Sequence, residues 1–326
     1  MRLATLPGST RDGQLVVVSR DLSRCVKVNG PVNTLFSALE SWAVVSPLLA
    51  RLAASLENGQ CENAEAFEEA KALAPLPRAP QWLDGSAFAS HGRLMMKAFN
   101  LSEDPGADGL PLMYQGMSDQ FLSASQDVPF PSEADGIDFE GEYAVVVDEV
   151  PMGAPAATAG KYIRLVLQMN DWSLRALGRR EMKTGFGFIQ GKPACSIAPV
   201  ALTPDELGGA WSRGRVSLPL EVELNGKVFG RPNGAQMEFS FPELIAHAAH
   251  TRRLSVGTII GSGTVSNDEA EVVGSACIAE RRAIEMISGA GPSTPFLAFG
   301  DTVRMECRTA DDHPLFGAIE QRVVAG

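Results

Sequence analysis

Three carboxylates occupy alternate positions of one short segment. Asp138, Glu140 and Glu142 in the sequence IDFEGE would share one face of a strand, because successive side chains of a strand point to opposite faces. Like charges at this spacing repel one another, and burying them costs on the order of several kcal/mol per ion. A hard divalent cation with oxygen ligands removes that conflict. The segment therefore fits a metal site, and it fits a solvated strand face equally well.

Two further charged residues could join such a site. Asp171 follows the apolar run 163–169 and precedes a segment of helical spacing, so it could enter a site from the end of a strand. The same position is also typical of a helix N-cap, which is the reading that this residue favours by itself. Lys192 lies in an apolar, glycine-rich stretch, where it is either a surface residue or a charge positioned near a site.

The histidines offer one candidate general base. His91 lies just past a proline-rich connector, and histidine has an ordinary pKa close to neutrality, although a lone histidine more often has a structural role. His247 and His250 have the spacing of a helical metal pair but no third ligand nearby in the sequence, which disfavours metal binding there. The glycine-rich segment 257–264 lacks the residues of a phosphate-binding loop and fits a tight turn that brings the backbone close to a ligand.

The composition narrows the class of protein. The 326 residues include 28 Lys and Arg against 39 Asp and Glu, a formal net charge of −11, which disfavours nucleic-acid binding because that depends on clustered cations. No run approaches the roughly 18 apolar residues of a membrane span, and the first residues lack a secretory leader. Five scattered cysteines without CxxC spacing fit neither a disulfide framework nor a zinc ribbon. We therefore expect a cytoplasmic enzyme that acts on a small molecule, with no membrane or nucleic-acid partner.

The elements that must position these residues divide the chain near residue 80, where Pro75, Pro77 and Pro80 mark a connector. Residues 1–80 are predicted to form a small N-terminal α/β domain. Its predicted elements are strands over 14–18 and 25–28, a helical region over 32–58 and a short helix over 63–71.

Residues 81–326 are predicted to form one β-rich domain with few helices. The predicted strands are 143–147, 163–169, 218–224, 258–260 and 302–306, and the predicted helices are 172–182 and 241–253. The expected fold class is therefore α+β and rich in strands.

Taken in chain order, four motifs of this domain resemble those of the fumarylacetoacetate hydrolase family, and of its fumarylacetoacetase branch in particular. The motifs are IDFEGE (137–142), MNDWSLR (169–175), QGKP (190–193) and GSGTVSN (261–267). The resemblance implies a mixed β-roll catalytic fold, a homodimer, and a bound Mg²⁺ or Ca²⁺, with Mn²⁺ as a further candidate. It also implies hydrolysis of a C–C bond in a diketo acid.

The resemblance also implies a role for each matching residue. The implied metal ligands are Asp84, Glu140, Glu142 and Asp171. The implied catalytic residues are the general base His91, its partner Glu280, and the cations Lys192 and Arg175 that stabilise the reacting oxygen. The implied substrate-binding residues are Tyr114, Gly263 and Thr264.

Two positions depart from the family pattern. A glutamine that the branch carries seven residues after the last metal aspartate would fall on Gly178, so one expected oxyanion donor is missing. The glutamate that orients the histidine would fall near Ile278, and Glu280 supplies it only if the register is shifted by two residues.

The favoured hypothesis is a metal-dependent hydrolase of fumarylacetoacetate, a reaction of aromatic amino acid catabolism, or of a related acylpyruvate. The alternative within the family is an oxaloacetate decarboxylase or isomerase, a chemistry that needs no water-activating base. The pairing of Asp84 with His91, seven residues apart, favours hydrolysis. A third hypothesis, motivated by Gly178 and Ile278, is a metal-binding protein without catalytic activity.

Overall fold

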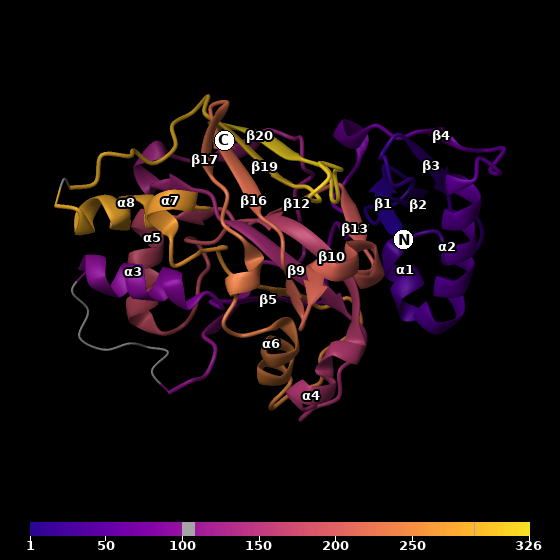
Figure 1. Ribbon diagram of the computed structural model, residues 1–326, viewed down its shortest axis with the longest axis horizontal. Helices are drawn as coiled ribbons and strands as arrows, with labels where there is room; N and C mark the ends of the chain where they lie inside the picture. The colour runs from indigo at the N-terminus through magenta and orange to yellow at the C-terminus, as the bar shows by residue number, and fades with distance from the viewer. Residues whose placement is uncertain (100–107, 290) are drawn as a thin grey trace.

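A computed structural model describes residues 1–99, 108–289 and 291–326, and its framework is two β-sheets (Figure 1). Within these residues the larger sheet has eleven strands. Their order is β4 (Glu65–Ala66), β3 (Arg24–Lys27), β2 (Gln14–Val18), β1 (Arg2–Leu6), β13 (Val200–Leu202), β10 (Ile163–Asn170), β9 (Gly141–Val147), β18 (Ile259–Gly261), β5 (Trp82–Gly85) and β6 (Met113–Gly116), with β12 (Ser196–Ile197) paired to β10. The five-stranded sheet has the order β17 (Lys227–Gly230), β16 (Leu220–Leu224), β19 (Thr302–Cys307), β20 (Ile319–Ala325) and β7 (Val128–Phe130).

The remaining elements lie around these sheets. Two short strand pairs are β8 (Ile137–Asp138) with β11 (Ser173–Leu174), and β14 (Trp211–Ser212) with β15 (Arg215–Val216). The helices are α1 (Leu35–Glu40), α2 (Trp42–Glu57), α3 (Ala89–Phe99), α4 (Ala156–Ala159), α5 (Arg175–Thr184), α6 (Phe241–Ala248), α7 (Ala270–Val273) and α8 (Ile278–Ile287). None of the helices in the described part of the chain has the length and apolar character needed to cross a membrane.

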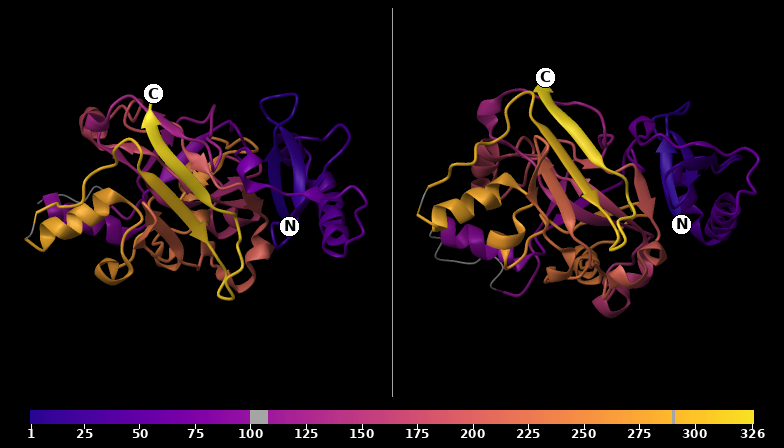
Figure 2. Two further views of the ribbon diagram at one scale, coloured as in Figure 1. Left: turned by 90° about the horizontal axis from the view of Figure 1, so that it is seen from above. Right: turned by 45° about the horizontal axis from the view of Figure 1, so that its top comes forward.

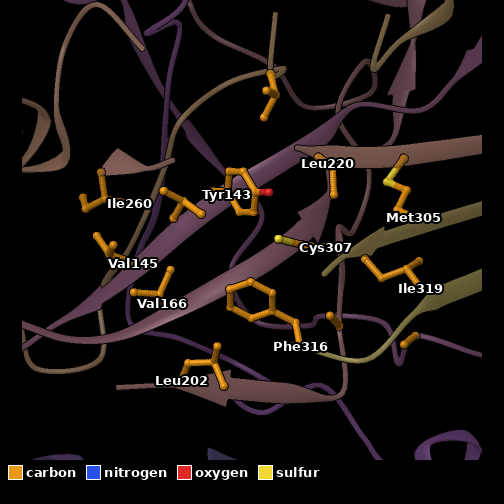
Figure 3. Packing of buried hydrophobic residues seen from close by; sticks show 14 of the residues in the cluster. Tyr143, Val145, Val166, Leu202, Leu220, Ile260, Met305, Cys307, Phe316 and Ile319 are labelled. Atoms are coloured by element: carbon orange, nitrogen blue, oxygen red, sulfur yellow. The ribbon is translucent and has the colours of Figure 1, made fainter. Parts of the chain in front are cut away.

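The central strand β9 is buried on both faces, which explains the apolar run over residues 143–147 that follows Glu142. Tyr143 and Val145 face the core between the two sheets, where they lie among side chains of both sheets such as Leu220 and Met305 (Figure 3). Ala144, on the opposite face of β9, belongs to a second core that includes side chains of α1 and α2. Strands held on both faces in this way are rigid supports for the polar residues at their ends.

The N-terminal domain extends the large sheet and packs its own two helices against it. Strand β1 pairs antiparallel with β13, with Arg2 opposite Leu202, so the sheet is continuous across both domains. In Figure 2 this domain lies at one end of the molecule, away from α3, α5 and α8 at the other. The fold is therefore β-rich α+β with a small N-terminal domain, as the sequence predicts.

The predicted strands are confirmed to within a few residues at each end, and three details differ. The predicted helix over 63–71 is wrong: the chain forms β4 and a 3₁₀ turn at Glu69–Lys71. Pairing with β3 outweighs helix propensity there, because it buries Phe67 and joins its N–H to the carbonyl of Ser23. The predicted helix over 172–182 begins only at Arg175, and the predicted helix over 241–253 ends at Ala248.

Candidate active site

Neighbouring strands of the large sheet bring three carboxylates together. Asp84 lies on β5, Glu142 on β9, and Asp171 directly after β10, and one oxygen from each lies within 4.8 Å of the other two. The parallel pairing of β5 with β18 sets Gly261 opposite Asp84. A Cβ at Gly261 would stand 2.3 Å from Asp84 Oδ1, so only glycine leaves room for this carboxylate. The helix N-cap reading of Asp171 is wrong, since the N-cap of α5 is Leu174.

Glu142 is a buried carboxylate without a hydrogen-bond partner among the described residues. It is fully buried, and neither of its carboxylate oxygens has a hydrogen-bond donor. Burial and then the neighbouring charges of Asp84 and Asp171 raise the pKa of Glu142 well above its ordinary value. Burial likewise raises the pKa of Asp84, with Asp171 adding to the shift. A hard cation would relieve both the desolvation and the repulsion, so these residues fit a divalent metal ion.

Replacing the Glu142 carboxylate with a neutral amide should stabilise the metal-free protein at higher pH. A carboxyl group with a raised pKa binds its proton more tightly in the folded state, so wild-type stability falls as pH rises above the ordinary value of 4.5. With a chelator present, the stability advantage of Glu142→Gln over wild type should grow steadily as the pH rises above 4.5. Thermal unfolding between pH 4 and 8 measures it. The exposed control Glu271→Gln should show no such growth, and a pH-independent difference for Glu142→Gln would contradict the account.

Asp171 differs from Glu142 in being fully hydrogen-bonded. The Tyr114 hydroxyl donates to its Oδ2 at 2.6 Å, and Lys192 Nζ lies 2.5 Å from the same oxygen. Cys195 Sγ lies 2.9 Å from Oδ1, and burial raises the pKa of this thiol, which therefore acts as a neutral donor. No pattern in the sequence singles out Cys195 for this site. Lys192 is thus a positioned charge and not a free surface lysine.

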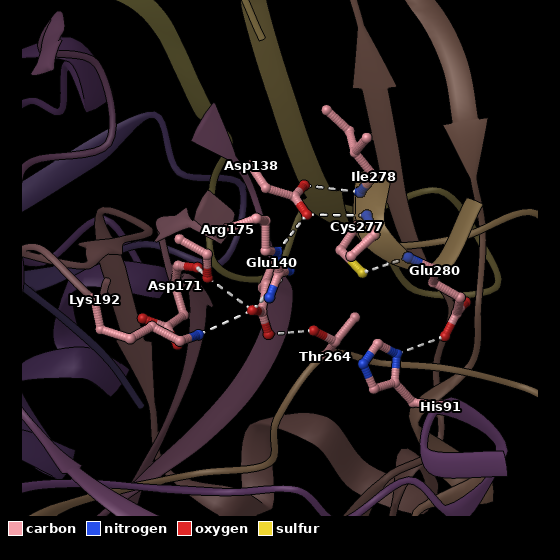
Figure 4. Close-up of polar contacts among 12 residues, drawn as sticks. His91, Asp138, Glu140, Asp171, Arg175, Lys192, Thr264, Cys277, Ile278 and Glu280 are labelled. Atoms are coloured by element: carbon pink, nitrogen blue, oxygen red, sulfur yellow. Dashed lines mark hydrogen bonds and ion pairs between the residues drawn. The ribbon is translucent and has the colours of Figure 1, made fainter. Parts of the chain in front are cut away.

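Glu140 lies beside the carboxylate group and faces cations. Its Oε1 lies 2.9 Å from both Lys192 Nζ and Arg175 Nη2, and its Oε2 accepts a hydrogen bond from Thr264 (Figure 4). Burial opposes ionisation, but these two cations outweigh it and hold the pKa of Glu140 well below its usual range. Glu140 is therefore ionised and already neutralised by side chains, unlike Glu142.

His91 and Glu280 form a hydrogen-bonded pair opposite these carboxylates. His91 lies in the first turn of α3 and Glu280 in the first turn of α8, and these two helices pack together. His91 Nδ1 is 2.9 Å from Oε2 of the fully buried Glu280 (Figure 4). Glu280 therefore takes the place of the histidine-orienting glutamate that the family pattern puts near Ile278. The Ile278 side chain itself is buried in the core.

Asp138 links the start of α8 to Arg175 through hydrogen bonds. The chain changes from one sheet to another between β8 and β9, so Asp138 does not share a face with Glu142, contrary to the prediction from strand alternation. Its fully buried carboxylate accepts the N–H groups of Ile278 (2.8 Å) and Ala279 (2.9 Å), which begin α8. The same carboxylate accepts Arg175 Nε at 2.8 Å. One side chain therefore anchors both the helix that carries the partner of His91 and the cation that holds Glu140.

Asp138→Asn should lower kcat by about tenfold or more with little change in KM or metal affinity. An amide can accept only through one atom, so a donor of α8 or Arg175 would lose its partner at a cost of about 1–3 kcal/mol. Steady-state kinetics with a metal titration tests this expectation. Asp127→Asn, on the exposed surface, is the matched control and should behave as wild type. A change confined to KM would show that Asp138 does not position the catalytic pair.

The predicted substrate-binding residues line the same pocket, of about 300 Å³. Tyr114, Gly263 and Thr264 contribute to its wall together with His91 and Lys192. Gly263 has φ +74° and donates its N–H to Asp84 Oδ1 at 3.1 Å, and a Cβ there would stand 2.3 Å from the carbonyl oxygen of Gly85.

Several predicted site residues do not line the pocket, namely Glu142, Asp171, Glu280 and Arg175. The guanidinium of Arg175 contacts Asp138 and Glu140 instead. Gly178 lies on α5 against Gly191, where a Cβ at Gly191 would approach within 2.8 Å of the Gly178 Cα. His247 and His250 line an adjoining hollow, which shares Met113 and Tyr114 with the pocket. In the described part of the chain the group of three carboxylates is the one cluster with metal-ligand geometry.

Comparison with known proteins agrees with this geometry. Residues 81–324 match the model of the fumarylacetoacetate hydrolase C-terminal domain, and residues 1–78 match that of fumarylacetoacetase N-terminal domain 2. The chain belongs to the fumarylacetoacetate hydrolase family. The sequence resemblance is therefore confirmed.

Individual members of the fumarylacetoacetate hydrolase family differ in activity. The chain is 30% identical over 210 residues to the fumarylacetoacetase of Aspergillus fumigatus, covering 56% of this chain and 49% of that protein. It is 24% identical over 157 residues to the mitochondrial oxaloacetate tautomerase Fahd2a of Rattus norvegicus, covering 47% and 48%. The chain thus spans about half the length of these relatives.

A solved structure of the fumarylacetoacetate hydrolase fold extends over the whole chain. Maleylpyruvate hydrolase of Sphingobium sp. SYK-6, solved with manganese(II) and pyruvate, superposes with a TM-score of 0.65 at 15% identity and covers 100% of both chains. At this identity the likeness establishes the fold, and it includes the N-terminal domain.

Proposed function

We propose that the protein is a metal-dependent hydrolase that cleaves a C–C bond in a diketo acid, with acylpyruvates and fumarylacetoacetate as candidate substrates. The observation that carries the proposal is the His91–Glu280 pair, because His91 lines one small pocket together with the buried carboxylates Asp84 and Glu140. A buried carboxylate behind an imidazole is an arrangement that suits general-base catalysis. The names of the fungal fumarylacetoacetase and of the maleylpyruvate hydrolase support the same class of reaction.

Asp84, Glu142 and Asp171 would hold the metal ion, with Glu140 as a fourth candidate ligand beside them. The ion would satisfy the two Glu142 oxygens that have no donor. Oxygen ligands suit Mg²⁺, Ca²⁺ and Mn²⁺, and the manganese in the maleylpyruvate hydrolase supports the last of these. A bound divalent ion supplies Lewis acidity, which polarises the carbonyl group under attack.

The chain's own residues would carry the proton transfers. Glu280 accepts the Nδ1 proton of His91, which leaves Nε2 free to take a proton from water. The water oxygen then bonds to the carbonyl carbon, the C–C bond breaks, and the electron pair goes to the leaving carbon, which takes up a proton. Lys192, the cation that lines the pocket, would stabilise the oxygen that becomes negative. The products are a carboxylic acid and a shorter keto acid or ketone.

The second candidate function is tautomerisation or decarboxylation of oxaloacetate. The tautomerase relative supports it, and this chemistry needs an enolate site without water attack. The His91–Glu280 pair favours hydrolysis over decarboxylation, which needs no base to activate water. Tautomerisation also moves a proton, and it is distinguished from hydrolysis by its products.

Turnover of acetylpyruvate, fumarylacetoacetate and oxaloacetate, side by side with Mg²⁺ or Mn²⁺, tests the proposal. Release of the carboxylic acid from at least one diketo acid, abolished by a chelator, is the expected result. Conversion of oxaloacetate alone would instead establish the second candidate.

We also propose a homodimer and a cytoplasmic location, as the family resemblance and the sequence imply. Light scattering at micromolar concentration should then give twice the chain mass of 34.7 kDa. A mass of one chain would contradict the dimer.

A further inference from the structure

The part of the pocket wall away from the carboxylates is apolar. Phe88 on the chain before α3, Leu112 and Met113 near β6, and Met182 and Phe188 from α5 and the loop after it all line the pocket. Leu112 is 45% exposed and Met182 is 69% exposed, so both lie at the mouth. A substrate that binds at the carboxylate end must extend its other end along these side chains.

Among the described residues that line the pocket, Lys192 is the one permanent cation, and the next one, Arg252, lines the adjoining hollow and not the pocket. That lysine is already paired with Glu140 and Asp171. The basic residues of α5, which are Arg179, Arg180 and Lys183, do not line the pocket. The undescribed residues 100–107 contain no lysine, arginine or histidine in their sequence.

The formal charge of the site also disfavours a second carboxylate on the substrate. Six buried carboxylates gather there: Asp84, Asp138, Glu140, Glu142, Asp171 and Glu280. They face two side-chain cations, Lys192 and Arg175, and would face one divalent ion. The site therefore stays negative before any substrate binds. One substrate carboxylate can be held at the metal and Lys192, but a second one at the far end would meet apolar side chains without a counterion, which is unfavourable.

We propose that the substrate carries a single carboxylate, at its keto-acid end, and an uncharged apolar acyl group at the other. The inference rests on the proposed hydrolase function and narrows its substrate class. It disfavours fumarylacetoacetate, the first candidate from the sequence, because that molecule carries a carboxylate at each end. The pocket volume of about 300 Å³ is at the small end of ligand sites, so the acyl group is short.

A matched pair of substrates tests the inference directly. Crotonylpyruvate and fumarylpyruvate differ only in a methyl group against a carboxylate at the distal carbon. Wild-type kcat/KM should be at least about tenfold higher for crotonylpyruvate, a factor that corresponds to about 1.4 kcal/mol. Equal values, or a preference for fumarylpyruvate, would overturn the inference while leaving the hydrolase function intact. If neither substrate releases pyruvate with metal present, and no other diketo acid is cleaved, the proposed function itself fails.

Variants at the mouth of the pocket give an independent test. Met182→Arg, and separately Leu112→Arg, should shift the ratio of kcat/KM values toward fumarylpyruvate by about tenfold, mainly through KM for that substrate. Phe186→Arg is the matched control, because Phe186 follows α5, is 98% exposed and does not line the pocket. It adds the same charge to the same region and should leave the ratio unchanged. An equal shift in the control would show long-range attraction and not a contact in the pocket. No shift in either mouth variant would contradict the placement of the acyl group.

Discussion

Replacing His91 with alanine is expected to lower kcat for diketo acid hydrolysis by about 10²–10⁴-fold, the usual contribution of a positioned general base. The imidazole is held at 2.9 Å by the buried Glu280, and its other edge faces the side of the site where Thr264 and Glu140 lie (Figure 4). Metal affinity should stay unchanged, because His91 is not part of the carboxylate group. Steady-state kinetics together with calorimetric metal titration separates the two effects.

Glu280→Gln tests the hydrogen-bond partner of His91 and should lower kcat less than His91→Ala does. The amide can still accept the Nδ1 proton of His91, but it no longer stabilises the imidazolium that forms during proton transfer, so a smaller loss of kcat is expected. Arg93→Ala, on the exposed surface of α3, controls for changes in that helix. If His91→Ala retains near wild-type hydrolysis of every diketo acid, another group is the base and the tautomerase function gains support.

Glu142→Gln should reduce affinity for Mg²⁺ or Mn²⁺ by at least about 100-fold, because residues behind metal ligands already contribute 10–100-fold. Activity should fall with the affinity and recover in part at high metal concentration. At a metal concentration 100 times the wild-type Kd, binding stabilises the wild-type protein by about 2.7 kcal/mol, whereas the variant should gain only about 0.4 kcal/mol.

Stability measurements on both the metal-free and the metal-loaded protein distinguish the loss of a metal ligand from a general packing defect. The same substitution should stabilise the protein in chelator and weaken its response to metal, a combination that a general packing defect cannot produce. Glu271→Gln, on the exposed surface, should change neither quantity. A Glu142→Gln protein that binds metal as tightly as wild type would show that the ion lies elsewhere.

The sequence predicted β9, β10 and β18 because they are buried on both faces, whereas it missed β5 and the half-exposed β20. Burial on both sides requires continuous apolar runs such as that of β9, and these are visible without a structure. The grouping of Asp84 with Glu142 and Asp171 came from the family resemblance. Spacing alone placed Asp138 on one face with Glu140 and Glu142, since alternation assumes an unbroken strand. The chain instead changes sheets after Asp138.

Long-range pairing decided the features that the sequence did not predict. The segment 63–71 has helical composition, but the neighbouring edge of β3 draws it into a strand. The contact of Asp138 with the start of α8 joins residues 140 positions apart, and no local pattern predicts such a contact. The sequence left the pairing of Glu280 with His91 uncertain because the expected register pointed to Ile278 instead.

The pairing of β1 with β13 has a consequence for how the two domains depend on each other. Because β13 has β1 on one side and β10 on the other, removing residues 1–80 would leave one row of its backbone N–H and C=O groups open to solvent. Exposed strand edges recruit other chains and promote aggregation, which natural proteins avoid by covering them. The N-terminal domain supplies none of the residues that line the pocket, yet it covers an edge of the catalytic domain at which uncontrolled strand pairing would otherwise start.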